Sequence, residues 1–218
     1  PQPVRDECVA VIGDLERRLD RTLRFANDAN CFALSEATDG AAAGAAVVFG
    51  VILGTGVGGG IVVNGSIVTG ANAIGGEWGH NPLPWPRDDE RPGAECYCGQ
   101  RGCLETFLSG PALEREGERR TGAHRRATDL AETPDGAAIM DDYVDRLARA
   151  LATVINVVDP NVIVLGGGLS NITRLYEDVP RCWSEYVFSD EVATRLVRAQ
   201  YGDSSGVRGA AWLWGSVD

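Results

Sequence analysis

The chain has 218 residues, of which 44% are hydrophobic, and its formal net charge is −11 at pH 7. This length and composition suffice for one good-sized domain or two small lobes. The excess negative charge argues against a nucleic-acid or anionic-membrane surface, because either partner would be repelled. All 20 basic residues are arginine, which excludes a phosphate loop of the Walker type with its essential lysine. A small molecule is therefore the favoured ligand.

Two helices are predicted near the start of the chain, over about residues 14–23 and over 31–37. Asn27 or Asp28 would cap the second helix, because asparagine and aspartate are among the residues preferred at helix N-termini. The position of Asp28 taken alone is explained as well by capping as by a chemical role.

A glycine-rich stretch lies between two predicted strands. Residues 45–53 and 61–68 have the composition of strands, and residues 54–60 between them read Gly-Thr-Gly-Val-Gly-Gly-Gly. Dinucleotide and Walker loops need a helix after the glycines, whereas a strand follows here. A glycine hairpin can still present bare amides to a phosphate, although these residues alone slightly favour a plain hairpin.

Residues 76–105 contain one histidine and three cysteines with the spacing of a metal site: His80, Cys96, Cys98 and Cys103. Three thiolates and one imidazole suit a tetrahedral zinc ion, and a complete ligand set without an open position indicates a structural site. A disulfide with a spare cysteine is less favoured, because Cys-x-Cys is too tight for easy bridging. The remaining cysteines lack ligand spacing and are expected to be small apolar fillers: Cys8, Cys31 and Cys182.

Two acidic residues flank the candidate metal ligands. Glu77 lies three positions before His80, and Glu105 lies two positions after Cys103. A zinc ion that holds this loop in shape would fix both carboxylates in space, where they could bind the hydroxyl groups of a polar ligand. The spacer around residues 88–90 is expected to be a surface loop.

The carboxyl-terminal half alternates helix and strand. An amphipathic helix is predicted over residues 139–158 and a buried strand over 161–165, after which the glycines at 166–168 lead into another helix. A glycine turn from strand to helix is the usual place for a nucleotide in an open α/β sheet. A short apolar helix is predicted over 207–213, and residues 114–135 are expected to form an exposed connection.

Together these motifs resemble the ROK family of sugar kinases and repressors. The resemblance extends over about residues 27–214, and its most specific part is the His…Cys-x-Cys-Gly-x-x-Gly-Cys-x-Glu arrangement that ends at Glu105. Within the family the chain looks most like bacterial fructokinases of the manno(fructo)kinase type, particularly through residues 79–85. The fold implied is α/β, the actin-like ATPase (ribonuclease H-like) fold, in which two lobes close on a cleft.

The resemblance also implies a division of the chain. The family opens with a strand bearing Asp-x-Gly-Gly-Thr, and nothing similar precedes Asn27. By resemblance roughly a third of an ordinary kinase is missing from the amino-terminal side, so the chain as it stands would turn over poorly or not at all. Residues 1–37 would be the remnant of an N-terminal lobe, completed by a helix over 203–218, and residues 38–202 would form the C-terminal lobe.

Carried over position by position, the resemblance gives each motif a role. Asp28 matches the catalytic base, which takes the proton from a sugar hydroxyl as that hydroxyl attacks the γ-phosphate of ATP. The sugar-binding positions are matched by Asn27, Glu77, His80 and Glu105. The ATP-binding positions are matched by the second phosphate loop, Gly54, Thr55, Gly56, Val57, Gly58, Gly59 and Gly60, and by the adenosine-side turn, Gly166, Gly167 and Gly168.

Two metal ions are implied in the same way. A structural Zn²⁺ would be held by His80, Cys96, Cys98 and Cys103, and the second nitrogen of His80 could then face the sugar. Mg²⁺ would arrive with ATP, since phosphoryl transfer depends mainly on positioning and charge neutralisation.

The expected function is ATP-dependent phosphorylation of a hexose, D-fructose first, to give fructose 6-phosphate. An N-acetylglucosamine kinase is the nearest alternative, because residues 27–36 occur in that branch as well. A sugar-responsive transcriptional repressor is a further alternative, although a pure sensor has no need of Asp28 as a base beside an ATP site. A zinc-stabilised protein without activity is the fourth.

The expected partners are ATP and a hexose, with no membrane and no nucleic acid, and the resemblance favours a homodimer. The sequence shows no signal peptide and no apolar run long enough to span a bilayer. Cysteines without a disulfide pattern are typical of the cytoplasm. The cytoplasm is therefore the predicted location.

Overall fold

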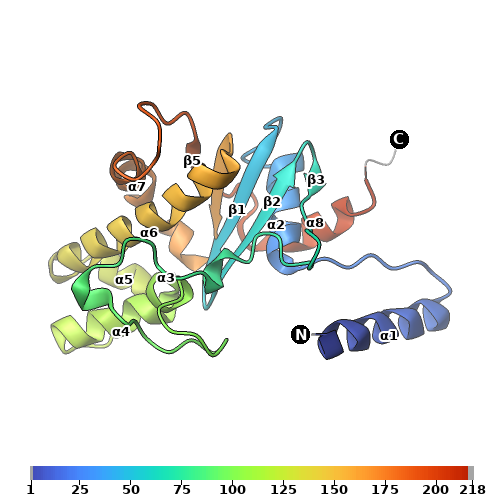
Figure 1. The fold of residues 1–218 in the computed structure, drawn as a ribbon, viewed down its shortest axis with the longest axis horizontal. Helices are drawn as coiled ribbons and strands as arrows, with labels where there is room; N and C mark the ends of the chain where they lie inside the picture. The colour runs from blue at the N-terminus through green and yellow to red at the C-terminus, as the bar shows by residue number, and fades with distance from the viewer. Residues whose placement is uncertain (1, 216–218) are drawn as a thin grey trace.

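The computed structural model describes residues 2–215, and its centre is a five-stranded sheet with the strand order β3-β2-β1-β4-β5 (Figure 1). The strands are β1 (Val47–Leu53), β2 (Val57–Val63), β3 (Ser66–Ile67), β4 (Val162–Gly166) and β5 (Arg195–Arg198). β1 pairs antiparallel with β2 and parallel with β4, which is in turn parallel to β5. The carboxyl ends of β1, β4 and β5 therefore meet at the same end of the sheet.

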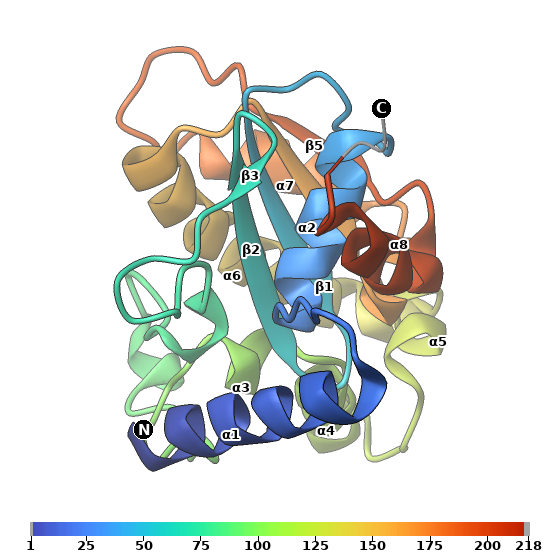
Figure 2. The ribbon, with the colours of Figure 1, turned by 90° about the vertical axis from the view of Figure 1, so that its right-hand side faces the viewer.

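Helices cover both faces of the sheet (Figures 1 and 2). One face packs against α6 and α7, and the other packs against α2, which is itself covered by α8. The helices are α1 (Gln2–Leu19), α2 (Asp28–Thr38), α3 (Glu105–Leu108), α4 (Gly110–Thr121), α5 (Ala127–Ala131), α6 (Ala137–Val158), α7 (Leu175–Trp183) and α8 (Ser205–Trp212). Short 3₁₀ helices are η1 (Trp78–His80), η2 (Asp88–Glu90), η3 (Pro134–Gly136), η4 (Gly168–Asn171) and η5 (Gly202–Ser204).

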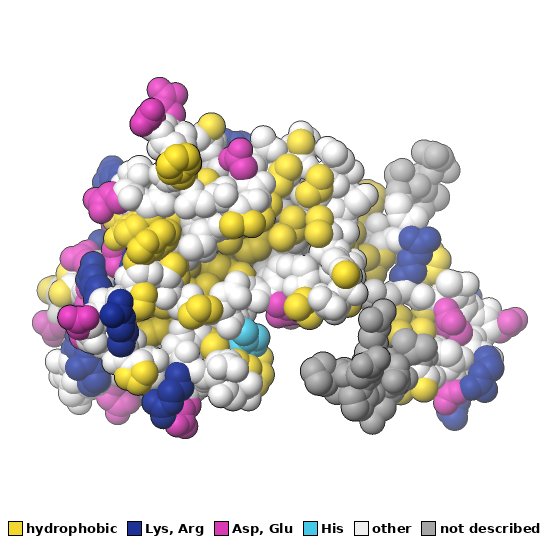
Figure 3. Space-filling model, viewed as in Figure 1, with side chains coloured by type: hydrophobic (Ala, Val, Ile, Leu, Met, Phe, Trp, Pro, Cys, Tyr) yellow, Lys and Arg dark blue, Asp and Glu magenta, His cyan; other side chains and the backbone are white. Residues whose placement is uncertain are grey.

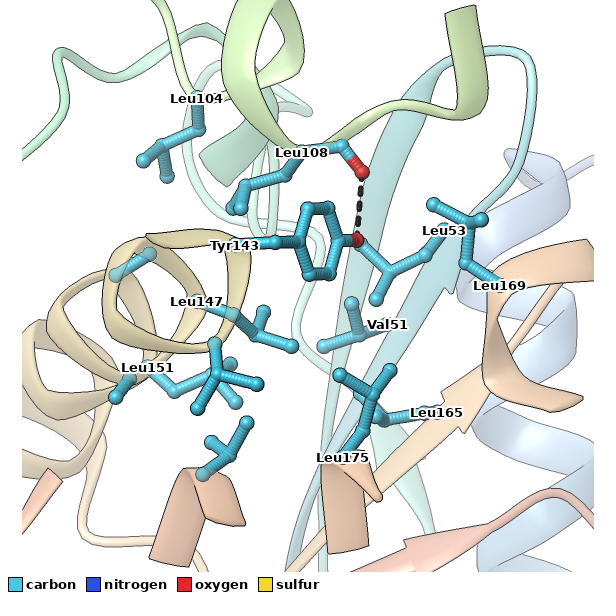
Figure 4. Packing of buried hydrophobic residues seen from close by; sticks show 14 of the residues in the cluster. Val51, Leu53, Leu104, Leu108, Tyr143, Leu147, Leu151, Leu165, Leu169 and Leu175 are labelled. Atoms are coloured by element: carbon cyan, nitrogen blue, oxygen red, sulfur yellow. Dashed lines mark hydrogen bonds between the residues drawn. The ribbon is translucent and has the colours of Figure 1, made fainter. Parts of the chain in front are cut away.

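The larger core lies between the sheet and α6. Leu147 of this helix and the strand residues Val51 and Leu165 are all fully buried in it (Figure 4). One turn earlier in α6, the hydroxyl of Tyr143 donates a hydrogen bond of 2.9 Å to the carbonyl of Leu108, the last residue of α3. The core therefore fixes the position of α3, which begins at a residue of the candidate site.

The second core lies between the sheet and α2, where Phe32 is buried against strand side chains. Two glycines allow the neighbouring elements to approach the backbone of α2. A Cβ atom at Gly60 of β2 would lie 2.6 Å from the carbonyl oxygen of Ala29, and one at Gly209 of α8 would lie 1.7 Å from that of Cys31. Any larger residue at either position would push α2 out of its place.

A buried carboxylate fastens α2 to the segment that leads into α8. Glu36 is fully buried and accepts hydrogen bonds from the backbone N–H of Ala41 at 2.9 Å and of Gln200 at 3.0 Å, and from the Ser205 hydroxyl at 2.7 Å. Hydrogen bonds to an ionised acceptor are stronger than neutral ones. The first residue of α2, Asp28, is thus carried by a helix that is anchored on both sides.

The structure corrects three boundaries predicted from the sequence. The first helix is α1, which ends at Leu19 and not at 23. Only residues 54–56 form the turn after β1, whereas 58–60 belong to β2, because bare glycine backbone lets α2 and η1 pack closely against that strand. Residues 114–135 are not an exposed connection, because they overlap α4 and contain α5, whose Leu130 is fully buried.

The remaining predicted elements are present as α2, β1, α6, β4 and α8, with small shifts of their ends. The strand expected over 61–68 is divided between β2 and β3, and the helix expected directly after 166–168 is the short η4, with α7 beginning only at Leu175. The division into a lobe of residues 1–37 with 203–218 and a lobe of 38–202 stays a prediction, and residues 1 and 216–218 lie outside the described residues. α1 stands away from the sheet in Figure 1. Among the described residues, no helix combines the length and the apolar character that a membrane span requires.

Candidate active site

Two backbone turns follow neighbouring parallel strands at the same end of the sheet. Residues 54–56 turn the chain after β1, and Gly167 and Gly168 turn it after β4. Open α/β sheets bind their ligands just outside the carboxyl ends of such strands. A cleft opens beside each of these two turns.

The cleft beside the β1 turn has a volume of about 390 Å³. Its lining includes residues 54–58 and every residue predicted to act on the sugar: Asn27, Asp28, Glu77, His80 and Glu105. These side chains come from α2, from the segment around η1 and from α3, so the fold brings together residues that are far apart in the sequence. We call this space the acidic cleft.

Asp28 is the first residue of α2 and is exposed at the mouth of the acidic cleft. Asn27 is the N-cap residue, and its side-chain oxygen accepts a hydrogen bond of 2.8 Å from the N–H of Ala29. The same N–H donates to Oδ1 of Asp28 at 2.9 Å. Within the described residues Oδ2 of Asp28 makes no hydrogen bond, so one carboxylate oxygen is available to a ligand.

Glu105 joins the metal-ligand loop to the turn after β1. Its Oε2 accepts a hydrogen bond of 3.0 Å from the N–H of Val57. A Cβ atom at Gly56 would lie 2.7 Å from this oxygen, which explains why a glycine occupies that position. The carboxylate is half-buried and is held against the backbone that would receive a phosphate.

Glu77 is the N-cap residue of η1 and His80 is its last residue, and this short helix is anchored on β2. The indole N–H of Trp78 donates a hydrogen bond of 3.0 Å to the carbonyl of Gly58. A Cβ atom at Gly79 would lie 2.0 Å from the carbonyl oxygen of Val57, so only glycine fits there. This close packing fixes the positions from which the two side chains reach the acidic cleft.

The four predicted metal ligands lie together, with all their ligand atoms within 4.8 Å of one another. Nδ1 of His80 is 3.5 Å from Sγ of Cys96, and Sγ of Cys98 is 3.6 Å from Sγ of Cys103. In a tetrahedral zinc site with Zn–S bonds of about 2.3 Å, neighbouring ligand atoms are about 3.5–3.8 Å apart. The donor set and its spacing therefore fit a structural Zn²⁺.

The cysteine environment supports the same interpretation. Burial, together with the neighbouring thiols of Cys98 and Cys96, raises the pKa of Cys103 to about 12. A lone thiolate is therefore disfavoured at this position, whereas a zinc ion holds its thiolate ligands deprotonated. A cation at the centre of the cluster would therefore favour the thiolate of Cys103.

Tyr97 is a site residue that the sequence reasoning missed. Its hydroxyl lies 2.9 Å from Nε2 of His80, and the two rings meet edge to face with their centroids 5.0 Å apart. Tyr97 lines the acidic cleft, and burial and the nearby charge of Glu105 raise the pKa of its phenol. Its place between two cysteine ligands was visible in the sequence, but the direction of its side chain was not.

The second cleft, of about 600 Å³, lies beside the turn after β4 and is lined by Gly167 and Gly168 together with Asn171, Arg198 and Tyr201. Gly166 does not line it. A Cβ atom at Gly166 would lie 2.5 Å from the ring of Phe32, so this glycine serves the packing of α2.

The glycines predicted to bind phosphate divide in a similar way. Gly54, Gly56 and Gly58 line the acidic cleft with Thr55 and Val57, whereas Gly59 and Gly60 do not. A Cβ atom at Gly59 would lie 2.7 Å from the carbonyl oxygen of Gly76, and Gly60 faces α2. The glycine content of β2 thus has a packing cause besides any contact with ATP.

The fold and the two clefts agree with an α/β protein of the actin-like ATPase class. The chain belongs to the ROK family, whose sequence model matches residues 4–217. An N-acetyl-D-glucosamine kinase from Yersinia pseudotuberculosis is 43% identical over 209 residues, which cover 92% of this chain and 69% of that protein. The family predicted from the motifs is therefore confirmed.

Solved structures agree with this assignment. A ROK hexokinase from Thermus thermophilus is 32% identical with a TM-score of 0.81, over 92% of this chain and 67% of that one. A ROK glucokinase from Streptomyces griseus, in complex with glucose and AMPPNP, is 25% identical with a TM-score of 0.79, over 93% of this chain and 71% of that one. The predicted fold class is confirmed by these similarities.

Proposed function

We propose that this protein transfers the γ-phosphate of ATP to a hydroxyl group of N-acetyl-D-glucosamine. ROK membership and similarity to sugar kinases support the reaction class. The choice of sugar is supported by the relatives at 43% and 42% identity, which are N-acetyl-D-glucosamine kinases. D-fructose, the sugar expected first from the sequence, has no such support and stays an alternative.

The observation that carries the proposal is the free carboxylate oxygen of Asp28 at the mouth of the acidic cleft. A carboxylate in this position can take the proton of a sugar hydroxyl as the hydroxyl attacks the phosphate. Glu77 and Glu105 would accept hydrogen bonds from other hydroxyls and so hold the sugar ring in one orientation. Asn27, which shapes the start of α2, would contribute its free amide group.

The nucleotide would lie between the two turns. Backbone N–H groups of Thr55 and Gly56 would contact the phosphates, and the cleft at Gly167 and Gly168 would hold the nucleoside, since both turns lie at the carboxyl ends of neighbouring strands. Mg²⁺ bound to ATP supplies charge neutralisation for the transferred phosphate. The zinc site would keep His80 and Glu105 in position and take no part in the transfer.

We expect Asp28→Asn to lower kcat for N-acetyl-D-glucosamine by about 100-fold or more, because general-base catalysis is typically worth about 100- to 10,000-fold. The measurement is sugar-dependent ADP release by the full-length gene product, offered N-acetylglucosamine, fructose, glucose and mannose. Asp190→Asn, a change at an exposed loop residue, is the matched control. A preference for fructose would restore that sugar as the substrate.

Absence of turnover with every sugar would contradict both kinase proposals and would direct the search to DNA binding, as expected of a ROK repressor. The acidic cleft favours the kinase, because a repressor needs a sugar site but no base facing it. A homodimer and a cytoplasmic location, both expected from the sequence, stay predictions.

One surface bears on the question of partners. Figure 3 shows hydrophobic side chains gathered over the middle of one face, with most charged side chains towards its margins. A groove between β2, the segment before η1 and the end of α6 is lined by Ile61, Ile74 and Val157 together with polar residues such as Asn81, and Ile74 and Val157 are exposed.

A further inference from the structure

Glu36 of α2 is fully buried, and each of its carboxylate oxygens accepts two hydrogen bonds. Oε2 accepts from the backbone N–H groups of Ala41 and Gln200, at 2.9 and 3.0 Å. Oε1 accepts from the backbone N–H of Tyr201 at 3.2 Å and from the hydroxyl of Ser205 at 2.7 Å. This arrangement suits an ionised carboxylate, which accepts at both oxygens, whereas an amide of the same shape accepts at only one.

Two of these donors belong to the wall of the cleft beside the turn after β4, which we call the nucleotide cleft. Gln200 and Tyr201 line it, and they follow β5 at the carboxyl end of the sheet. Their backbone N–H groups are bonded to Glu36. A further hydrogen bond of 3.0 Å, from the Tyr201 hydroxyl to the carbonyl of Asp39, joins the same wall to the end of α2. The wall of the nucleotide cleft is therefore attached to α2.

The same helix carries Asp28 at its other end. Asp28 is the first residue of α2, and Glu36 follows eight residues later, which in an α-helix is about 12 Å along the axis. Residues 29–37 are all buried. Because closely packed interiors have low compressibility and transmit strain, a shift of the cleft wall reaches the helix that holds the proposed base.

The bond from Ser205 serves another contact. Ser205 is the first residue of α8 and lines neither the nucleotide cleft nor the acidic cleft. Glu36 thus makes two kinds of contact, one that packs α8 against α2 and one that holds the cleft wall. A substitution that breaks only one kind separates a role in the fold from a role in the reaction.

Resting on the function proposed above, we propose that Glu36 is a positioning residue for phosphoryl transfer. It touches neither substrate, because it lines neither cleft. By holding Gln200 and Tyr201 against α2, it sets the place of the nucleotide relative to Asp28. Phosphoryl transfer depends mainly on positioning, and a displacement of about 1 Å can cost about 100-fold in rate.

The test compares Glu36→Gln with Ser205→Ala in the full-length protein. The new amide nitrogen can take the place of Oε1, where the Ser205 hydroxyl accepts from it but the Tyr201 N–H faces a donor. In the flipped orientation the nitrogen faces the N–H groups of Ala41 and Gln200. Either way a bond to the cleft wall is broken, whereas Ser205→Ala leaves both bonds to the wall intact.

The quantities measured for each protein are kcat, the KM for ATP and for N-acetylglucosamine, the Kd of ADP by calorimetry, and the unfolding free energy in urea. We expect Glu36→Gln to raise the KM for ATP and the Kd of ADP about tenfold and to lower kcat about tenfold, with less than about a twofold change in the KM for N-acetylglucosamine. Ser205→Ala should lower the unfolding free energy and keep kcat and the KM for ATP within about twofold of the wild type.

A Glu36→Gln protein that loses stability but keeps its kcat and its KM for ATP would overturn the proposal, and so would equal kinetic changes in the two variants. If Glu36→Gln does not fold, Glu36→Asp takes its place with the same expectation, since it keeps the charge and shortens the side chain by one methylene. Failure of both variants to fold would assign Glu36 to the fold alone.

The proposed function is tested separately by the wild type. The Kd of ADP is measured without sugar, so it reports on the cleft wall whichever sugar is the substrate. A wild type that does not phosphorylate N-acetylglucosamine contradicts the proposed function itself.

Discussion

At the scale of single residues, Glu90 shows how a buried ion pair can be hidden in an acidic stretch. Residues 88–90 were expected on the surface, and the structure exposes Asp88 and Asp89 but buries Glu90. Its carboxylate accepts hydrogen bonds of 3.0 and 2.8 Å from the guanidinium of Arg149 and one of 2.8 Å from Arg146. These contacts fasten the spacer of the metal loop to α6.

The charge of Glu90 makes stability depend on pH. Burial alone would raise its pKa, but the hydrogen bonds from Arg149, Arg146 and the Arg87 N–H outweigh burial and lower the pKa to about 2 from 4.5. A lowered folded-state pKa stabilises the fold above about pH 4.5, and the contribution is lost as pH falls towards 2. The full contribution of this carboxylate to the unfolding free energy is about 3 kcal/mol, because each unit of pKa difference corresponds to about 1.4 kcal/mol.

We therefore expect the difference in unfolding free energy between the wild type and Glu90→Gln to shrink as the pH is lowered from 5 to 3. Urea unfolding at several pH values measures this difference. Glu95→Gln changes an exposed carboxylate of the same loop and serves as the control. Parallel pH profiles for the wild type and Glu90→Gln would show that the pair does not carry the acid sensitivity.

At the scale of elements, the contact between α2 and α8 depends on one glycine. Gly209 is buried where the two helices cross, and a Cβ atom there would lie 1.7 Å from the carbonyl oxygen of Cys31. Gly206 lies in the same helix, and a Cβ atom there would meet nothing within 4 Å. The same substitution at these two positions should therefore have opposite effects.

Gly209→Ala is expected to lower the unfolding free energy by about 1–3 kcal/mol, because added volume at a tight contact forces the backbones apart. Gly206→Ala should be neutral or stabilising by up to about 1 kcal/mol, since alanine favours a helix more than glycine does. Thermal unfolding of both variants is the measurement. Equal effects at the two positions would contradict the close approach of α2 and α8.

The elements also show what the sequence could and could not predict. The helix over 139–158 could be predicted because its apolar residues recur at helical spacing, and the strand over 161–165 because it contains a short continuous apolar run. The glycines at 58–60 were assigned to a loop because glycine usually marks turns. Glycine is required at these positions because the backbones of α2 and of the segment around η1 lie directly on β2. Such a contact between distant segments leaves no pattern in the local sequence.

The candidate site was predictable to a similar degree. Asp28, Glu77 and Glu105 stood beside recognisable motifs, and the acidic cleft brings all three together. Tyr97 and Glu90 stood in the same stretch of sequence but gave no signal. Whether a tyrosine faces a cleft, or an acid faces a buried arginine 59 residues away, is decided only by the tertiary fold.

At the scale of the whole molecule, the metal-ligand cluster lies outside both hydrophobic cores. Neither core includes any of the four predicted metal ligands, which are His80, Cys96, Cys98 and Cys103. The loop that joins them has little regular structure, with only η1 and η2 in the described part. Zinc should therefore order this loop, while the sheet and its helices keep their packing without it.

We expect one zinc ion per chain, and we expect a strong chelator to lower the melting temperature while the far-ultraviolet circular dichroism at 25 °C stays nearly unchanged. The three ligand thiols should then react with a thiol reagent that did not reach them before. Cys182→Ala, outside the cluster, is the control and should retain the zinc. A chelated protein with the same melting temperature would mean that the cluster binds no structural metal.

The packing of α2 also has a consequence for the order in which the molecule can assemble. The helix that carries Asp28 is synthesised well before α8, which covers it, because the hydrogen bond between Glu36 and Ser205 joins residues 169 positions apart. On the ribosome, α2 can meet β1 and β2 soon after these strands emerge, but its outer side stays uncovered until residues 205–212 follow. The helix that begins the acidic cleft is thus among the last parts of the fold to be closed.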